Sequence, residues 1–139
     1  MSENQISINK IEGGRVEFAF KKVESAKVYL KEKAKEYRSL IEKLTTMLLT
    51  NGLGQTIAFI KAKAEIKNGN KNAYMIILEQ IDEYFKANEI VGTIKKGNEN
   101  LVKWIITKDT TEYKLIAQEI VSLFKWLKRF AQGLIARED

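Results

Sequence analysis

The segment KWLKRF, residues 125–130, places three cations and an indole ring together near the end of a 139-residue chain. Lys125 and Arg129 are four residues apart, a spacing that puts both side chains on one strip of a helix. Cations on such a strip can bind phosphate groups, and the neighbouring Trp126 ring can stack on a nucleobase. In the structural alternative, Trp126 covers the edge of the core and the cations complement the helix dipole. The segment is therefore a candidate nucleic-acid contact with an equally supported structural alternative.

The composition of the whole chain is basic, with 24 Lys and Arg residues against 18 Asp and Glu residues and a formal net charge of +6. Such a balance favours contact with a polyanion, because cations that bind phosphates release counterions from them. A lysine-rich solvated surface, of the kind found in thermophile proteins, would give the same charge. Two further basic regions are Lys31, Lys33, Lys35, Arg38 and Lys43, and Lys61, Lys63, Lys67 and Lys71. Single lysines in these regions are expected to be solvated, but several can share one face of a bundle.

The absence of histidine and cysteine limits the enzymatic chemistry open to the chain. It excludes thiolate or imidazole zinc sites, disulfides, Cys or Ser–His nucleophiles and a histidine base. The adjacent carboxylates of Asp82 and Glu83 would point in different directions from a helix, so they are not expected to work as an acid–base pair. We therefore predict a protein that is not an enzyme and that uses no cofactor or metal.

The segment TNGLGQTIAF, residues 50–59, contains two glycines that invite comparison with phosphate-binding loops. A P-loop needs a preceding strand, the GxxxxGK[ST] spacing and a lysine, none of which surrounds Gly52 and Gly54. The GxGxxG dinucleotide pattern also fails, because Ile57 occupies the position of its third glycine. The segment is better interpreted as a corner between two helices.

Gly52 is suited to end a helix, because glycine adopts a positive φ without a Cβ penalty. With Gly52 at the first position beyond the helix, Asn51 is the C-cap and Leu53 is expected to contact Leu48, as in a Schellman ending. Gly54 would let the next helix start within a few residues. The corner would then fix the two helices as close neighbours.

Apolar residues recur at spacings of three and four through most of the chain, as in amphipathic helices. The clearest stripe, in the last helix, is Tyr113, Ile116, Ile120, Leu123, Phe124, Leu127, Ala131 and Leu134. The predicted helices run from about Arg15 to a break within residues 31–35, on to the corner, and then over residues 54–67, 74–85, 101–106 and 109–134. Asp109 can cap the last helix while Glu112 reaches back to it. No segment alternates with period two over a useful length, so the predicted fold class is all-α, a single-domain bundle of about six helices.

The remaining boundaries follow from local composition. Residues 1–14 are predicted to be a flexible N-terminal arm, because their isoleucines lie in a polar, Gly-ended context, and residues 15–139 form the helical domain. The segment IKNGNKN, residues 66–72, suits a turn, and residues 90–100 are the longest candidate loop. No apolar run approaches the roughly 20 residues that span a bilayer, and the start of the chain lacks a signal-peptide pattern. We predict a cytoplasmic protein without a membrane partner.

Taken together, the corner NGLGQTIAF, the preceding YRSLIEKLTTML and the terminal EYKLIAQEIVSLFKWLKRFAQGL give the chain a recognisable resemblance. It resembles the small α-helical subunit of the type III-B, or Cmr, CRISPR effector complex, over about residues 15–134. The resemblance implies a non-catalytic subunit that stacks in several copies along the complex. It would lie beside the repeated backbone subunit that holds the guide RNA, and other subunits would cleave the target RNA in antiviral defence.

The resemblance also assigns roles to basic residues of this chain. Lys125, Lys128 and Arg129 are the first candidates for contacts to target-strand phosphates, with Trp126 beside them. Arg38, Lys61 and Lys63 are secondary candidates. The partners implied are the backbone subunit, guide RNA, target RNA and further copies of the chain, and such protein contacts follow the shape of the RNA backbone rather than its sequence.

Two other hypotheses remain. In the first, the chain is a helical protein–protein adaptor with no direct RNA contact, and its charge serves solubility. In the second, which has the least support, it is an enzyme using lysine or carboxylate chemistry. A deep pocket with converging carboxylates or a desolvated lysine would favour the enzyme.

Overall fold

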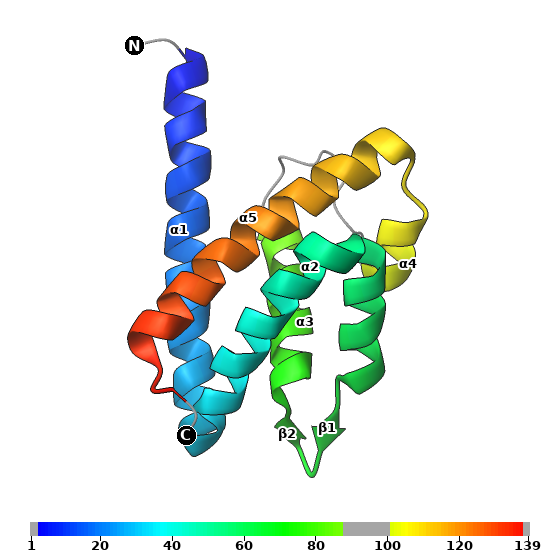
Figure 1. The fold of residues 1–139 in the computed structure, drawn as a ribbon. Helices are drawn as coiled ribbons and strands as arrows, with labels where there is room; N and C mark the ends of the chain where they lie inside the picture. The colour runs from blue at the N-terminus through cyan, green and yellow to red at the C-terminus, as the bar shows by residue number, and fades with distance from the viewer. Residues whose placement is uncertain (1–2, 88–100, 138–139) are drawn as a thin grey trace.

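The structure, a computed structural model, describes residues 3–87 and 101–137. Within these ranges the chain forms five α-helices, one 3-10 turn and a small antiparallel hairpin (Figure 1). The elements are α1 (Glu3–Leu30), η1 (Lys31–Lys33), α2 (Ala34–Lys63), β1 (Ile66–Lys67), β2 (Asn70–Lys71), α3 (Ala73–Ala87), α4 (Leu101–Ile106) and α5 (Thr110–Leu134). The predicted all-α class is confirmed. Five helices are found in place of about six, because α2 continues through the corner as one kinked helix.

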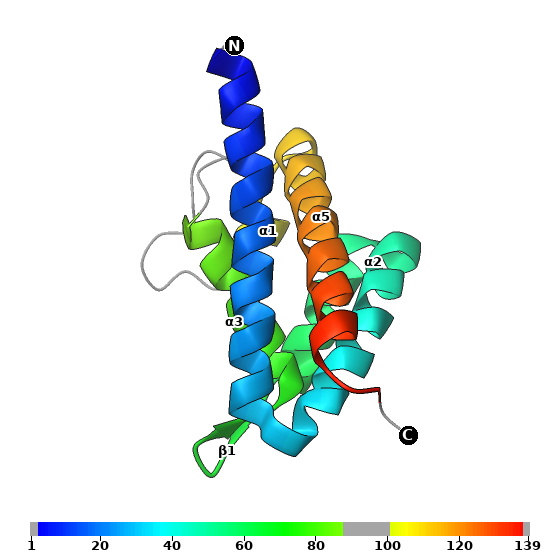
Figure 2. The same ribbon diagram turned by 90° about the vertical axis from the view of Figure 1, so that its left-hand side faces the viewer.

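Helix α5 lies between α1 and α2, and α3 also packs against α2 (Figures 1 and 2). The predicted apolar stripe of α5 is confirmed as its core face: Ile116, Ile120, Leu123, Phe124, Leu127 and Ala131 are buried. Tyr113 and Leu134, at the two ends of the stripe, are partly buried. The period of apolar residues therefore located the core side of the longest predicted helix correctly.

Helix α1 begins at Glu3, well before the predicted start near Arg15. Its first turns extend past the other helices, as Figures 1 and 2 show. The prediction was wrong because it treated the pair Gly13–Gly14 as a boundary. A helical glycine costs only about 1 kcal/mol relative to alanine, and the helix runs through both glycines. The boundary at residue 14 is therefore not an end of secondary structure.

The corner at Gly52 is a kink inside α2, where φ is 86° and ψ is 173°. The predicted positive φ is confirmed, but the ψ angle is not that of the left-handed helical residue in a Schellman ending. It lies in a region that is essentially restricted to glycine. Leu48 and Leu53 on either side are both buried. Figure 1 shows the two arms of α2 leaving the kink in different directions.

Helix α5 supports the second arm of α2 directly. The Gly54 amide donates a 2.7 Å hydrogen bond to the Tyr113 hydroxyl, which thereby satisfies a free N–H group at the start of this arm. A Cβ added at Gly54 would lie 3.2 Å from that hydroxyl oxygen. Gly54 is thus a site of close approach between α2 and α5 as well as part of the corner.

The predicted helix over residues 54–67 is too long, because α2 ends at Lys63. The turn predicted for IKNGNKN is confirmed, and it is the tip of the hairpin in which Ile66 pairs with Lys71. Asn68 and Gly69 have φ angles of 55° and 77°. Two successive positive φ angles at Asn-Gly are typical of the tight turn that joins antiparallel strands, which explains why two residues on each side pair as strands.

Two further boundaries are confirmed. The break predicted within residues 31–35 is the 3-10 turn η1, in which Lys31 has a φ of 55°. Asp109 is the N-cap of α5, and its side chain accepts a 2.9 Å hydrogen bond from the Glu112 amide. The loop predicted for residues 90–100 lies outside the described residues.

Candidate nucleic-acid interface

The outer strip of α5 presents the cations of KWLKRF. Lys125 and Arg129 are exposed, and Lys128 between them is half-buried. The strip faces outward because Phe124, Leu127 and Ala131 turn the other side of the helix into the core. The structure therefore brings the first-choice cations together on one accessible edge of the molecule.

Trp126 packs against other aromatic rings in the structure. Its ring stacks on Phe130, with 5.7 Å between centroids and 26° between planes. Phe130 in turn meets Phe20 of α1 edge-on at 5.3 Å. These three rings form an aromatic row that joins α5 to α1. Trp126 is half-buried in this row, which favours packing over base stacking.

Arg38 of α2 is directed to the end of α5. Its Nη1 donates to the backbone oxygen of Ile135 at 2.8 Å and lies 3.4 Å from that of Gln132. Its Nε lies 3.6 Å from Glu42, and the side chain is only 12% exposed. Arg38 thus satisfies carbonyl groups at a helix C-terminus, where a cation is also favoured by the helix dipole.

Lys61 and Lys63 lie exposed in the last turn of α2, and Figure 1 shows that this end of α2 lies apart from the C-terminal half of α5. The structure brings Lys63 together with Lys43, a residue of a different basic region, at one aromatic ring. Their Nζ atoms lie 5.5 Å and 4.9 Å from the Phe59 centroid. Cation–π contacts at exposed sites contribute about 0.5–1 kcal/mol each. No local pattern in the sequence singles out Lys43, because its neighbour Phe59 comes from the other arm of α2.

A buried ionic group joins three helices. Arg15 of α1 and Glu119 of α5 form a 3.0 Å ion pair, and the Tyr84 hydroxyl of α3 donates to the same carboxylate oxygen at 2.8 Å. Burial raises the pKa of Tyr84 to about 12, so the hydroxyl keeps its proton at neutral pH. Because each member has a partner inside the group, the arrangement stabilises the packing of α1, α3 and α5 and does not present a free acid or base.

Other kinds of site receive no support from the residues that the structure describes. Among them, no three His, Cys, Asp or Glu side chains are grouped so that they could hold a metal ion. In the same part of the chain, no helix combines the length and the apolar character that crossing a membrane requires.

Comparison with known proteins identifies the family. The family model described as CRISPR-associated protein (Cas_Cmr5) matches residues 11–134. The crystal structure of a CRISPR-associated Cmr5 family protein from Thermus thermophilus has a similar fold, with a TM-score of 0.67. The two sequences are 23% identical, and the match covers 90% of this chain and 97% of that chain. The family match confirms the resemblance that the sequence motifs predicted: this chain belongs to the Cmr5 family of CRISPR-associated proteins and is a small subunit of a Cmr complex of type III CRISPR defence.

Proposed function

We propose that this Cmr subunit is non-catalytic, that it stacks in several copies beside the repeated backbone subunit, and that it holds target RNA through the α5 strip of Lys125, Lys128 and Arg129. The observation that carries the proposal is the exposed pair Lys125 and Arg129 on the outer edge of a rigid, core-packed helix. Cations fixed on such an edge bind phosphates regardless of sequence. Recognition of sequence would be left to pairing between guide and target RNA.

The remaining candidate residues, Lys61, Lys63, Arg38 and Trp126, are not all part of the proposed interface. Lys61 and Lys63 are exposed and lie on another surface, so they would form a separate contact. Arg38 is engaged by the backbone oxygens at the end of α5, and we leave it out of the proposed interface. Trp126 would position the strip through its stack on Phe130 and would not bind a base.

The experiment compares RNA binding by the isolated chain with binding by a variant in which Lys125, Lys128 and Arg129 are replaced by alanine. We expect weak, sequence-independent binding of single-stranded RNA that falls steeply with salt. On single strands, each phosphate contact contributes about 0.7 to the magnitude of the slope of log K against log salt. The slope of the variant should therefore be smaller in magnitude than that of the wild-type chain by about 2. A control variant with alanine at Lys27, Lys31 and Lys67 removes the same charge from other surfaces. Equal losses in the two variants would contradict a specific role for the α5 strip.

The second candidate function is the protein–protein adaptor without RNA contact. The packing of Trp126 into the aromatic row favours it, because the indole ring of KWLKRF is already used inside the protein. Under this hypothesis, the alanine variant of the α5 strip retains the RNA content of the assembled complex. Loss of RNA from the complex, with all protein subunits still present, would exclude the adaptor.

A further inference from the structure

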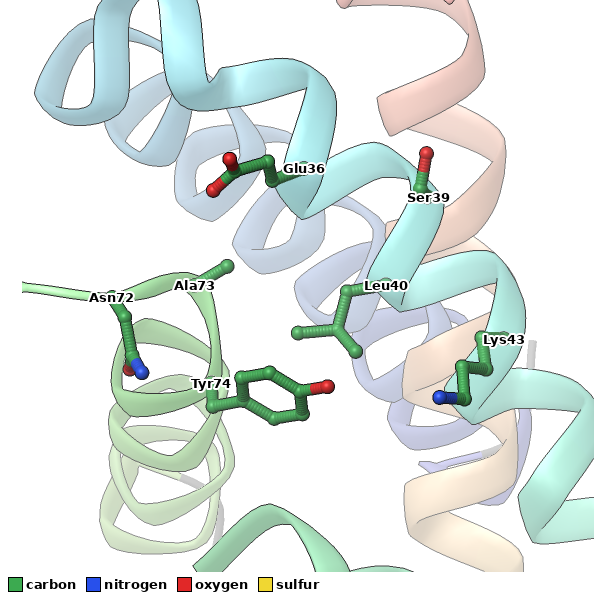
Figure 3. Close-up of a pocket in the computed structure, with 7 residues that line it drawn as sticks. All are labelled: Glu36, Ser39, Leu40, Lys43, Asn72, Ala73 and Tyr74. Carbon is green, nitrogen blue, oxygen red and sulfur yellow. The ribbon is translucent and has the colours of Figure 1, made fainter. Parts of the chain in front are cut away.

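A pocket of about 410 Å³ opens between the first arm of α2 and the start of α3. Its wall includes Glu36, Ser39, Leu40, Lys43, Asn72 and Tyr74. Figure 3 shows the Lys43 ammonium and the Tyr74 hydroxyl directed toward each other across one end, with Leu40 between α2 and α3 and Glu36 at the other end. The pocket thus has a cationic end, an apolar middle and an acidic end.

The cationic end continues beyond the pocket to Lys63. The Nζ atoms of Lys43 and Lys63 both lie over the Phe59 ring, which itself meets Tyr74 edge-on at 5.9 Å. Neither lysine forms an ion pair with any residue within 3–87 or 101–137. Both ammonium groups therefore lie within about 6 Å of the centre of one ring, and an anion bound at this end of the pocket would be attracted to both.

The wall of the pocket is fixed by Asn72. Its Oδ1 accepts hydrogen bonds from the Met75 amide at 2.9 Å and the Glu65 amide at 3.1 Å. Its Nδ2 donates to the Lys63 backbone oxygen at 2.8 Å. The side chain therefore ties the end of α2 to the start of α3 and fixes the backbone of Lys63 beside the pocket.

We propose that this pocket binds a single nucleoside phosphate unit, with its phosphate at the end formed by Lys43, near Lys63, and its base against Tyr74 and Leu40. The volume lies within the range of small-molecule sites, about 300–1,000 Å³. An apolar middle with cations at one end suits a flat base attached to a phosphate better than a bare anion. The Glu36 carboxylate at the far end would accept a hydrogen bond from the base and would repel a second phosphate there.

The proposal rests on the proposed RNA-binding function and adds to it a second site, separate from the α5 strip. The same chemistry has two sources, a nucleotide within single-stranded RNA and a free nucleotide. Each presents a phosphate group joined through ribose to a planar base, so the chemistry of the pocket suits both. The experiment therefore compares the two sources on the intact chain.

The test follows backbone amide resonances of the full chain during titration with adenosine monophosphate, uridine monophosphate, inorganic phosphate and a short single-stranded oligonucleotide. We expect saturable shifts near Lys43, Lys63 and Tyr74 with a mononucleotide, and at least about tenfold weaker binding by the Lys43→Gln, Lys63→Gln double variant. A Lys27→Gln, Lys31→Gln double variant is the matched control for charge and should bind like the wild-type chain. Tyr74→Phe, which keeps the ring against Phe59, should retain most of the binding.

Competition distinguishes the two sources. Displacement of the mononucleotide by the oligonucleotide at these amides would assign the pocket to RNA, and lack of displacement would assign it to free nucleotides. The proposal is overturned if mononucleotides leave these amides unshifted, if inorganic phosphate binds as tightly, or if the Lys43→Gln, Lys63→Gln variant binds unchanged. Alanine at Lys125, Lys128 and Arg129 should leave the mononucleotide shifts at the pocket intact. If this variant also binds RNA like the wild-type chain, the α5 interface is refuted, and the pocket is judged by the mononucleotide titration alone.

Discussion

Replacement of Gly52 by alanine tests whether the kink in α2 depends on glycine. With φ at 86° and ψ at 173°, this position lies where a side chain costs about 1–3 kcal/mol of backbone strain. A Cβ at Gly52 would meet no atom within 4 Å, so strain alone sets the expected loss. For a chain of 139 residues, 1 kcal/mol corresponds to about 3 °C in Tm, which predicts a fall of about 3–10 °C.

The matched control is Gly133→Ala, within α5. A Cβ there also meets nothing within 4 Å, but no unusual φ is present, so alanine should raise Tm by at most about 3 °C through its helix propensity. Thermal unfolding followed by circular dichroism measures both variants in one buffer. If Gly52→Ala melts at or above the wild-type temperature, the kink does not require glycine, and the explanation given for the corner is wrong.

Three further predictions concern contacts between helices and the start of α5. Tyr113→Phe removes the hydrogen bond to the Gly54 amide and should lower the free energy of unfolding by about 1 kcal/mol in urea denaturation. Gly54→Ala should lower that free energy less in the Tyr113→Phe background than in the wild type, because the hydroxyl that its Cβ would crowd is then absent. Asp109→Ala removes the N-cap of α5 and should cost about 1 kcal/mol in the same assay, whereas Asp109→Asn should cost a few tenths. The pKa of Tyr84 is raised by burial to about 12 from an unfolded value near 10, so its contribution to stability is complete below pH 10 and is lost as the pH rises toward 12. Between pH 8 and pH 11, the free energy of unfolding should fall more steeply in the wild-type protein than in Tyr84→Phe, which lacks this titrating group. Identical pH profiles for the two proteins would contradict the prediction.

The parts of the fold that could be predicted are those with a local cause. The core face of α5 follows from apolar spacing, and its start follows from the reach of the Asp109 side chain to an amide three residues on. The positive φ of Gly52 could be predicted because glycine, which has no Cβ, lies between two segments with a helical apolar pattern. Each of these signals lies within a few residues of the feature it predicts.

The errors have the opposite origin. The boundary predicted at Gly13 and Gly14 rests on the local preference of glycine against helices, but the penalty is small and α1 continues through both residues. The contact between Lys43 and Phe59 was missed, because it forms only when the kink at Gly52 brings Phe59 of the second arm of α2 close to Lys43 of the first arm. The hydrogen bond from Arg38 to the Ile135 backbone oxygen likewise could not be predicted, because it depends on how α2 packs on α5. Contacts between residues far apart in the chain have no local signature.

Affinity purification of this chain from its own cell, with identification of the bound proteins and RNA, tests the central claim most directly. A subunit that stacks beside the guide-bearing backbone should bring down that repeated subunit together with guide RNA. Replacement of Lys125, Lys128 and Arg129 by alanine should leave the proteins in place and reduce the captured target RNA. Recovery of neither guide RNA nor the backbone subunit with the wild-type chain would contradict the proposed role.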